Sequence, residues 1–453
     1  MAGLMNWKPG RCATTFTHSK EPLILPSKTG ASRALSSIIE DATPPCDLNP
    51  FLFNGHLQTF YTAAKDEGPS IHYKRRVFEQ EDSNFKGHFG VDFVVKPDVN
   101  DDVKPNVASD GGTEDEGLRE DPTGVGHREL PPRTTYWTDK EFEELGSNDE
   151  KPMLILLHGI SGGSHEVYLR NLLVPLTEPT PEGKKAGLTD GDWDALVVNS
   201  RGCAGTKITT SMIYNARATW DTRQVVKWVR SRWPRRPLYG VGFSLGANIL
   251  TNYMGEEGDE SLLNAACVIS APFKLESVAL ALQRTWLGLN VYSKVMADSM
   301  RQLYTNHADM FKKNSALDPE KLAKIQYLHE FDREVQTHTW GYPSEGAYYR
   351  DASSADVIMN IRRPFLAIHA KDDPIACDEG VPYEEFRQNP YTVLLATSGG
   401  GHVSWFEFGQ KRWFVKPVSP PPPSTCGYLP ETILTIQRPP TSSTPCATLI
   451  SKR

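Results

Sequence analysis

The stretch that most constrains the fold of this chain runs from Leu238 to Met254. The apolar run 238–243 predicts a buried strand, Gly-Phe-Ser-Leu-Gly follows at 242–246, and helix-forming residues continue from there. A glycine two residues on either side of Ser244 removes the side chains that would collide with the neighbouring strand and helix. The pattern therefore predicts a strand, a strained turn and a helix, with the Ser244 hydroxyl exposed at the start of the helix. This context favours a nucleophile elbow over an ordinary glycine-rich turn.

Strand-like runs alternate with helical patterns along most of the chain. The run 151–158 is continuously apolar, as in strands that are buried on both faces of a parallel sheet. Further strands are expected at 73–78, 89–95, 195–199, 238–243, 265–270, 364–369 and 391–396, and a helix at 214–232. This alternation predicts a mainly parallel, doubly wound α/β sheet. Ligands of such sheets bind outside the carboxyl ends of the strands, which is where Ser244 is expected.

The composition divides the chain into five parts. Residues 1–48 are rich in Ser, Thr and Pro and predict a loosely ordered extension. Residues 49–270 form the first part of the core, with an acidic, glycine-rich loop insertion at about 97–132. Aromatic-rich helical sequence at 271–359 predicts a helical cap over the strand ends, although most of its aromatics could individually be core residues. Residues 360–418 complete the core, and 419–453 form a Pro/Ser/Thr-rich tail.

Charge and composition exclude several classes of protein. The net charge of −7 and the lack of a basic stripe argue against nucleic-acid binding. No apolar run reaches the roughly 18 residues of a membrane span, and the N-terminus lacks a signal-peptide core, although peripheral membrane contact stays open. The seven cysteines are scattered and never spaced as C-x-x-C, which favours free thiols in a reducing compartment. We therefore expect an intracellular, cytoplasmic protein. We also expect no metal and no cofactor, since phosphate-binding and metal-binding motifs are missing.

A serine hydroxyl becomes a useful nucleophile when a base takes its proton and a third group orients that base. His402 follows the strand expected at 391–396 and a run of three glycines, so we assign it as general base and then general acid. Asp372 and Asp373 follow the preceding strand. The Asp-Pro-Ile step favours Asp373 as the orienting carboxylate, and Asp372 remains the alternative.

The tetrahedral intermediate of acyl transfer needs hydrogen-bond donors for its oxyanion. The backbone N–H of Leu245 follows the nucleophile and lies at the start of a helix, where the dipole also favours negative charge. The second donor is expected in the glycine-rich loop 158–164, and we place it at Ile160. His158 is expected to brace this loop and not to act as a second base.

Several motifs of the chain resemble the α/β-hydrolase superfamily. Within it they resemble the branch of YheT-type bacterial hydrolases, animal α/β-hydrolase-domain lipases and yeast medium-chain fatty acid ethyl ester synthase/esterases. The resemblance covers about 49–417 and rests on Asn54–Thr59, His158–Gly163, Asn199–Cys203, Gly240–Asn248, Asp372–Pro374 and Gly401–His402. We expect the Asn-Gly-His-Leu-Gln-Thr block at 54–59 to be a structural lock and not a ligand site. The chain departs from the family at the acidic insertion and at Pro420–Pro423, which prevents the usual final helix.

The resemblance implies an α/β-hydrolase fold with a cap between the nucleophile half and the Asp/His half. It also implies acyl transfer through a Ser244 acyl-enzyme, either as a carboxylic ester hydrolase or as an acyl-CoA:alcohol O-acyltransferase, on short to medium acyl chains. Acyl-CoA would then be a substrate, and water or an alcohol the acceptor. The choice of acceptor depends on how well the cap excludes water. A dedicated biosynthetic O-acyltransferase and a non-catalytic scaffold that binds a small ligand are the alternatives.

Overall fold

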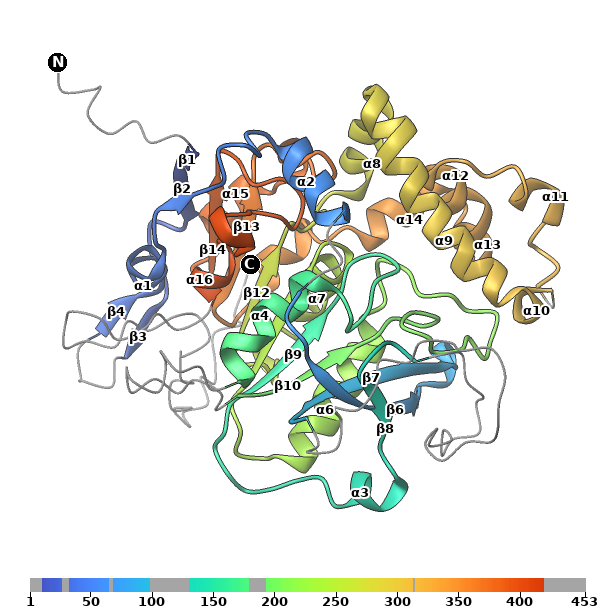
Figure 1. Ribbon diagram of the computed structural model, residues 1–453, viewed down its shortest axis with the longest axis horizontal. Coiled ribbons are helices and arrows are strands. Elements are labelled where there is room, and N and C mark those ends of the chain that lie inside the picture. The colour runs from blue at the N-terminus through green and yellow to red at the C-terminus, as the bar shows by residue number, and fades with distance from the viewer. Residues whose placement is uncertain are drawn as a thin grey trace, which may run out of the picture.

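The computed structural model describes residues 10–26, 32–64, 68–97, 130–178, 193–312 and 314–418. In these residues ten strands form one sheet, in the order β2-β14-β13-β12-β11-β9-β10-β7-β6-β8 (Figure 1). Their bounds are β2 Thr14–His18, β6 His72–Glu79, β7 His88–Val95, β8 Thr134–Tyr136, β9 Met153–Leu157, β10 Asp194–Val198, β11 Leu238–Phe243, β12 Ala265–Ile269, β13 Phe365–Ala370 and β14 Thr392–Thr397. The six strands from β14 to β10 in this order run parallel, and β2 and β7 add to them antiparallel. The predicted mainly parallel α/β sheet is confirmed.

The remaining elements are short strands and helices around this sheet. Two small sheets pair β1 Arg11–Cys12 with β5 Cys46–Asp47 and β3 Ile24–Pro26 with β4 Ser32–Ala34. In the described residues the helices outside the 271–359 region are α1 Leu35–Ala42, α2 Gly55–Ala64, α3 Asp139–Glu143, α4 Val167–Thr177, α6 Thr219–Arg232, α7 Leu245–Glu257, α15 Tyr383–Gln388 and α16 Val415–Val418. Single 3₁₀ turns occur at Ser83–Phe85, Gly258–Glu260, Asp356–Asn360, Asp378–Gly380 and Phe408–Gln410.

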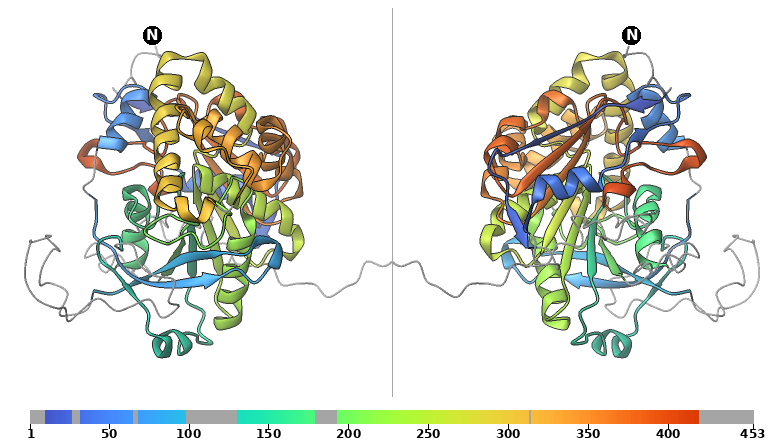
Figure 2. Two further views of the ribbon diagram at one scale, coloured as in Figure 1. Left: turned by 90° about the vertical axis from the view of Figure 1, so that its right-hand side faces the viewer. Right: turned by 90° about the vertical axis from the view of Figure 1, so that its left-hand side faces the viewer.

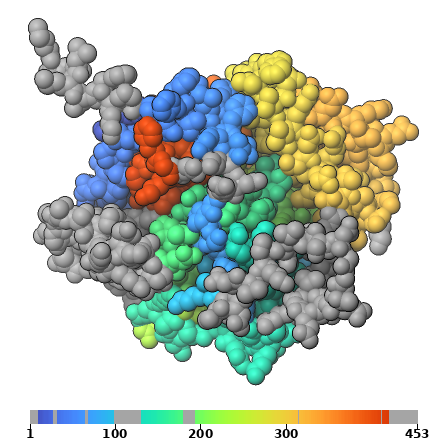
Figure 3. Space-filling view, viewed as in Figure 1, coloured from blue at the N-terminus to red at the C-terminus, as the bar shows by residue number. Residues whose placement is uncertain are grey.

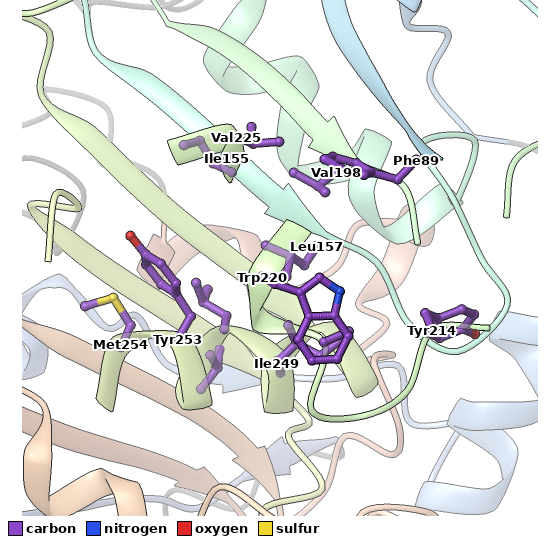
Figure 4. Packing of buried hydrophobic residues seen from close by; sticks show 14 of the residues in the cluster. Phe89, Ile155, Leu157, Val198, Tyr214, Trp220, Val225, Ile249, Tyr253 and Met254 are labelled. Atoms are coloured by element: carbon purple, nitrogen blue, oxygen red, sulfur yellow. The ribbon is translucent and has the colours of Figure 1, made fainter. Parts of the chain in front are cut away.

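The core lies on both faces of the parallel strands. Alternate residues of a strand point to opposite faces, so Ile155 and Leu157 of β9 join one buried cluster while Leu154 and Leu156 join the other. Helices α6 and α7 cover the first face, and part of that packing is drawn in Figure 4. Helices α1, α4 and α16 cover the second. Burial on both faces explains why β9 reads as a continuous apolar run.

The chain between β12 and β13 forms a set of helices beside the sheet. Its elements are α8 Leu275–Arg284, the π-helical turn Gly288–Ser293, α9 Lys294–Asn306, α10 Ala308–Phe311, α11 Pro319–Leu322, α12 Leu328–Phe331, the π-helical turn Asp332–Gln336, α13 Thr337–Trp340 and α14 Glu345–Ala352. We call this set the cap. It lies together on one side of the molecule, and the left view of Figure 2 looks onto it.

The expectation of a loosely ordered extension at 1–48 is wrong for the described part of that segment. Strand β2 pairs antiparallel along β14, and Ser398 N–H donates to the carbonyl of Ala13 at 2.9 Å. Helix α1 buries Leu35 and Ile39 against the sheet. Without this segment β14 would be an exposed edge strand, so the segment covers an edge that its composition does not reveal. Figure 3 shows the blue N-terminal segment against the red C-terminal part of the core.

Other expectations fall partly or wholly outside the described residues. The acidic insertion lies outside them at 98–129, and so does the tail at 419–453. Within the described part of the chain, no helix has the length and apolarity that crossing a membrane requires.

Candidate active site

Ser244 lies in a strained turn between β11 and α7. Its backbone has φ 50° and ψ −120°, a conformation that L-residues rarely adopt. A Cβ on Gly242 would come within 2.6 Å of the Gly246 carbonyl oxygen, and a Cβ on Gly246 within 2.4 Å of the His158 carbonyl oxygen. Both positions therefore require glycine. The strand, turn and helix expected around Ser244 are all present.

The structure brings the three predicted side chains Ser244, His402 and Asp373 together. His402 Nε2 lies 2.8 Å from Ser244 Oγ, and His402 Nδ1 lies 2.9 Å from Asp373 Oδ2. The Asp373 side chain is fully buried, and its Oδ1 accepts hydrogen bonds from the N–H groups of Ile375 and Ala376, both at 2.8 Å. A carboxylate at Nδ1 keeps the proton on that nitrogen, so Nε2 is free to accept the serine proton.

Asp372, the alternative acid, faces the glycine run and not the imidazole. Its Oδ1 accepts a hydrogen bond from the N–H of Gly401 at 3.0 Å. Burial raises the pKa of this carboxyl above its ordinary value. The arrangement gives Asp373 the contact with His402 and gives Asp372 a role in holding the loop that carries His402.

The block Asn54–Thr59 packs against the same loop. Thr59 Oγ1 accepts a hydrogen bond from the backbone N–H of His402 at 2.9 Å and donates one to the Gly55 carbonyl at 2.7 Å. Gln58 Oε1 accepts from the N–H of Phe406 at 2.8 Å. These contacts are those of a structural lock, as expected from the sequence. The sequence did not reveal which segment this block holds in place; the structure shows that it is the loop of His402.

The two expected oxyanion donors lie on either side of the nucleophile. Leu245 is the first residue of α7, and the loop after β9 comes so close that a Cβ on Gly159 would lie 3.3 Å from Ser244 Cβ. In that loop the N–H of Gly159 donates to the hydroxyl of Tyr168, and the N–H of Ser161 donates to that of Tyr214. Among the described residues the intervening Ile160 N–H has no acceptor. This geometry is compatible with Leu245 and Ile160 as the donor pair.

His158 braces this loop, as predicted. Its Nδ1 donates to the Gly159 carbonyl at 2.6 Å, and its Nε2 accepts from the N–H of Ser200 at 3.0 Å. Burial lowers the pKa of His158 to about 4, so the ring is neutral at physiological pH and both nitrogens are engaged.

A buried ion pair that the sequence analysis missed supports the same loop. Asp92 on β7 accepts two hydrogen bonds from Arg75 on β6, at 2.6 and 2.7 Å, and neither side chain has any exposed surface. Asp92 Oδ2 also accepts from Ser164 Oγ at 2.5 Å and from Asn199 Nδ2 at 2.8 Å. The sequence feature that could have indicated this ion pair is Asp92, a single aspartate within the mainly apolar run 89–95.

A pocket opens beside the serine, between the sheet and the cap. Ile160, Leu245 and residues 214–216 line it from the core, and residues of α8, α9, α12, α14 and the two π-helical turns line it from the cap. It encloses about 620 Å³, part of which is open to solvent. Among the described residues, no group of three or more His, Cys, Asp or Glu side chains is placed to hold a metal ion.

Comparison with known proteins places these residues in a wider context. A family model described as alpha/beta hydrolase fold matches residues 152–407, a range that includes Ser244, Asp373 and His402. A monoacylglycerol lipase of Saccharomyces cerevisiae is 36% identical over 375 residues, covering 81% of this chain and 78% of the relative. The medium-chain fatty acid ethyl ester synthase/esterase 2 of the same yeast is 31% identical over 396 residues, covering 82% and 84%. The putative esterase YheT of Escherichia coli is 26% identical over 283 residues, covering 60% and 79%.

Proposed function

This chain belongs to the α/β-hydrolase fold family and is a hydrolase of the lipase and esterase type, and from that premise we propose that it works through an acyl-enzyme on Ser244. The observation that supports this most directly is the His402 ring, whose two nitrogens lie 2.8 Å from Ser244 Oγ and 2.9 Å from Asp373 Oδ2. Nucleophile, base and orienting acid are then in one hydrogen-bonded row.

In the first half-reaction Ser244 Oγ attacks the ester carbonyl while His402 Nε2 takes the hydroxyl proton. The negative charge that develops on the carbonyl oxygen is stabilised by the N–H groups of Leu245 and Ile160. Asp373 orients the ring and stabilises its positive charge without taking the proton. His402 then donates the proton to the departing alkoxide, which leaves as the alcohol, and the acyl group stays on Ser244.

In the second half-reaction His402 removes a proton from the acceptor, which attacks the acyl carbonyl and releases Ser244. Water gives a carboxylic acid, and an alcohol gives a new ester. We propose both outcomes, on short to medium acyl chains, with acyl-CoA as an additional acyl donor. The support is that one yeast relative is named an ester synthase as well as an esterase. The name of the other suggests acylglycerols as substrates.

The test is acyl release from p-nitrophenyl esters of increasing chain length, by wild type and Ser244→Ala, with and without added ethanol. We expect Ser244→Ala to lower kcat by about 10⁴–10⁶-fold. With ethanol, chromatography should show wild-type product diverted from free acid to ethyl ester. Product that stays free acid at every ethanol concentration would restrict the protein to hydrolysis, and an active Ser244→Ala would refute the acyl-enzyme.

The two aspartates provide a matched pair for the orienting role. Asp373→Asn should lower kcat by about 10⁴-fold, because the amide favours the wrong tautomer of His402. Asp372→Asn keeps an oxygen that can accept from Gly401 and should have a much smaller effect. Equal losses in the two variants would contradict the assignment.

A further inference from the structure

The pocket beneath the cap has a lining that is partly apolar and partly polar. Leu275, Val278 and Leu282 of α8 form an apolar wall. The same lining includes the polar side chains of Asp332 and Gln336, which we call its polar side. An apolar pocket with a few converging polar groups is typical of a ligand site, in which the polar groups fix orientation and specificity. The acyl-transfer chemistry proposed above uses none of these polar groups.

The polar side of the pocket is built on irregular helix. Asp332 and Gln336 are the first and last residues of one π-helical turn, and Ser293, which also lines the pocket, ends the other. π-Helical turns are rare and occur frequently at functional sites, because the extra residue redirects side chains. Both π-helical turns found in the described residues thus contribute to this one pocket.

Two of the pocket's buried amides have an unused hydrogen-bonding atom. Gln336 is 2% exposed and donates through Nε2 to the Tyr214 carbonyl at 3.1 Å, while its Oε1 has no partner. Asn215 is 1% exposed and accepts through Oδ1 from the N–H of Arg217 at 2.9 Å, while its Nδ2 has no partner. A buried polar group without a partner costs free energy, and a ligand that supplies the partner removes that cost. The two amides supply one free acceptor and one free donor, which match a group that both donates and accepts, and His329 Nδ1 in the same lining is also without a partner.

The charges in the pocket limit what that group can be. No Lys or Arg is among the described residues that line the pocket, which disfavours a phosphate or a carboxylate. Burial raises the pKa of Asp332 to about 7, although the Tyr349 hydroxyl that donates to its Oδ2 at 2.8 Å opposes the shift. Burial also lowers the pKa of His329, which lines the same pocket. The lining therefore offers no positive charge, and its one carboxyl keeps its proton more readily than an ordinary aspartate, so the pocket suits a neutral polar group.

We propose that this side of the pocket, through Gln336 and Asn215 with Asp332 beside them, binds a hydroxyl group of the substrate, so that the enzyme selects neutral hydroxylated esters. The inference rests on the proposed acyl-transfer function. The hydroxyl has two sources, the alcohol part of a polyol ester or a hydroxylated acyl chain. Both present the same donor and acceptor pair to the two amides.

The experiment compares three esters with equal chain lengths: 1-octanoylglycerol, propyl octanoate and propyl hydroxyoctanoate. It measures kcat/KM for wild type, Gln336→Leu and Asn215→Asp. The second variant keeps the Oδ1 atom that accepts from the Arg217 N–H and replaces the Nδ2 donor by an oxygen, and urea unfolding checks that it folds. Thr339→Val is the matched control, since Thr339 Oγ1 is also buried without a partner in the cap but does not line the pocket.

We expect wild type to prefer one hydroxylated ester over propyl octanoate by at least about tenfold, the effect of one hydrogen bond, and the preferred ester identifies the source. Gln336→Leu and Asn215→Asp should each reduce this preference about tenfold with little change on propyl octanoate, and Thr339→Val should keep it. Equal selectivity in all four proteins, or a preference for an anionic phospholipid, would overturn the proposal. Turnover of p-nitrophenyl octanoate distinguishes failure of the hydroxyl subsite from failure of the Ser244 acyl-enzyme. If this turnover depends on Ser244 but the hydroxylated esters are not preferred, only the subsite is refuted.

Discussion

Replacing Asp92 by asparagine tests whether the buried ion pair holds the loop 158–164, which carries the proposed oxyanion donor Ile160. Burial alone would raise the pKa of Asp92, but the adjacent Arg75 charge and the hydrogen bonds hold that pKa below its ordinary value. The Asp92 side chain is therefore an anion. The Asp92→Asn side chain would keep the shape but lose the charge and present an NH₂ group to donors. Removing one partner of a buried pair costs about 3–5 kcal/mol, because the other charge stays buried. We expect a loss of that size in the free energy of unfolding.

Arg76, the next residue on β6, provides the control. It pairs with Asp139 at 2.6 Å, and the Asp139 side chain is 62% exposed, so Asp139→Asn should cost only about 0.2–1 kcal/mol. Urea unfolding of both variants measures the difference. At urea concentrations well below its unfolding midpoint, Asp92→Asn should also turn over p-nitrophenyl esters about 10²-fold more slowly than wild type. The reason is that the loop that carries Ile160 loses its hydrogen bond from Ser164 to Asp92. Equal stability of the two variants would refute the reasoning.

Two further predictions concern Asp332 and Thr59. The folded protein holds the Asp332 proton up to about pH 7, whereas the unfolded chain releases it near 3.8, so wild-type stability falls as pH rises between these values. Asp332→Asn has no carboxyl to titrate, so its free energy of unfolding relative to wild type should rise by about 4 kcal/mol from pH 4 to pH 8. If urea unfolding shows a difference between the two proteins that does not change with pH, the raised pKa of Asp332 is contradicted. Thr59→Val leaves the His402 N–H without an acceptor and should lower kcat about tenfold. Thr59→Ser keeps a hydroxyl acceptor and should have a kcat close to that of wild type. Equal rates of the two variants would show that the hydroxyl does not position His402.

How far the sequence predicted this molecule depends on how local each signal is. The strand and elbow around Ser244 are encoded by adjacent residues, so the apolar run and the two flanking glycines were sufficient. The choice between Asp372 and Asp373 is a matter of one residue, and only the position of His402 in space distinguishes them. The pairing of β2 with β14 joins residues about 380 positions apart, and the composition of the N-terminal segment does not reveal it.

The Arg75–Asp92 pair shows a related limit. A strand pattern assigns a polar residue to the solvent face, and this assignment holds unless a second chain segment brings an opposite charge to it. β6 brings Arg75, and the segments at Ser164 and Asn199 fill the remaining acceptor sites of the carboxylate. Burial of Asp92 is therefore decided by three segments together, and no single one of them reveals it.

The proposed catalytic residues and the proposed hydroxyl subsite are held by different parts of the chain, which has a consequence for specificity. Ser244, Asp373 and His402 follow sheet strands and are fixed by the sheet and by the block at 54–59. Asp332 and Gln336 belong to a π-helical turn of the cap. A substitution in that turn can change which ester is selected while the distances among Ser244, Asp373 and His402 stay the same. Selectivity and rate should therefore vary independently in cap variants and fall together in variants of the His402 loop.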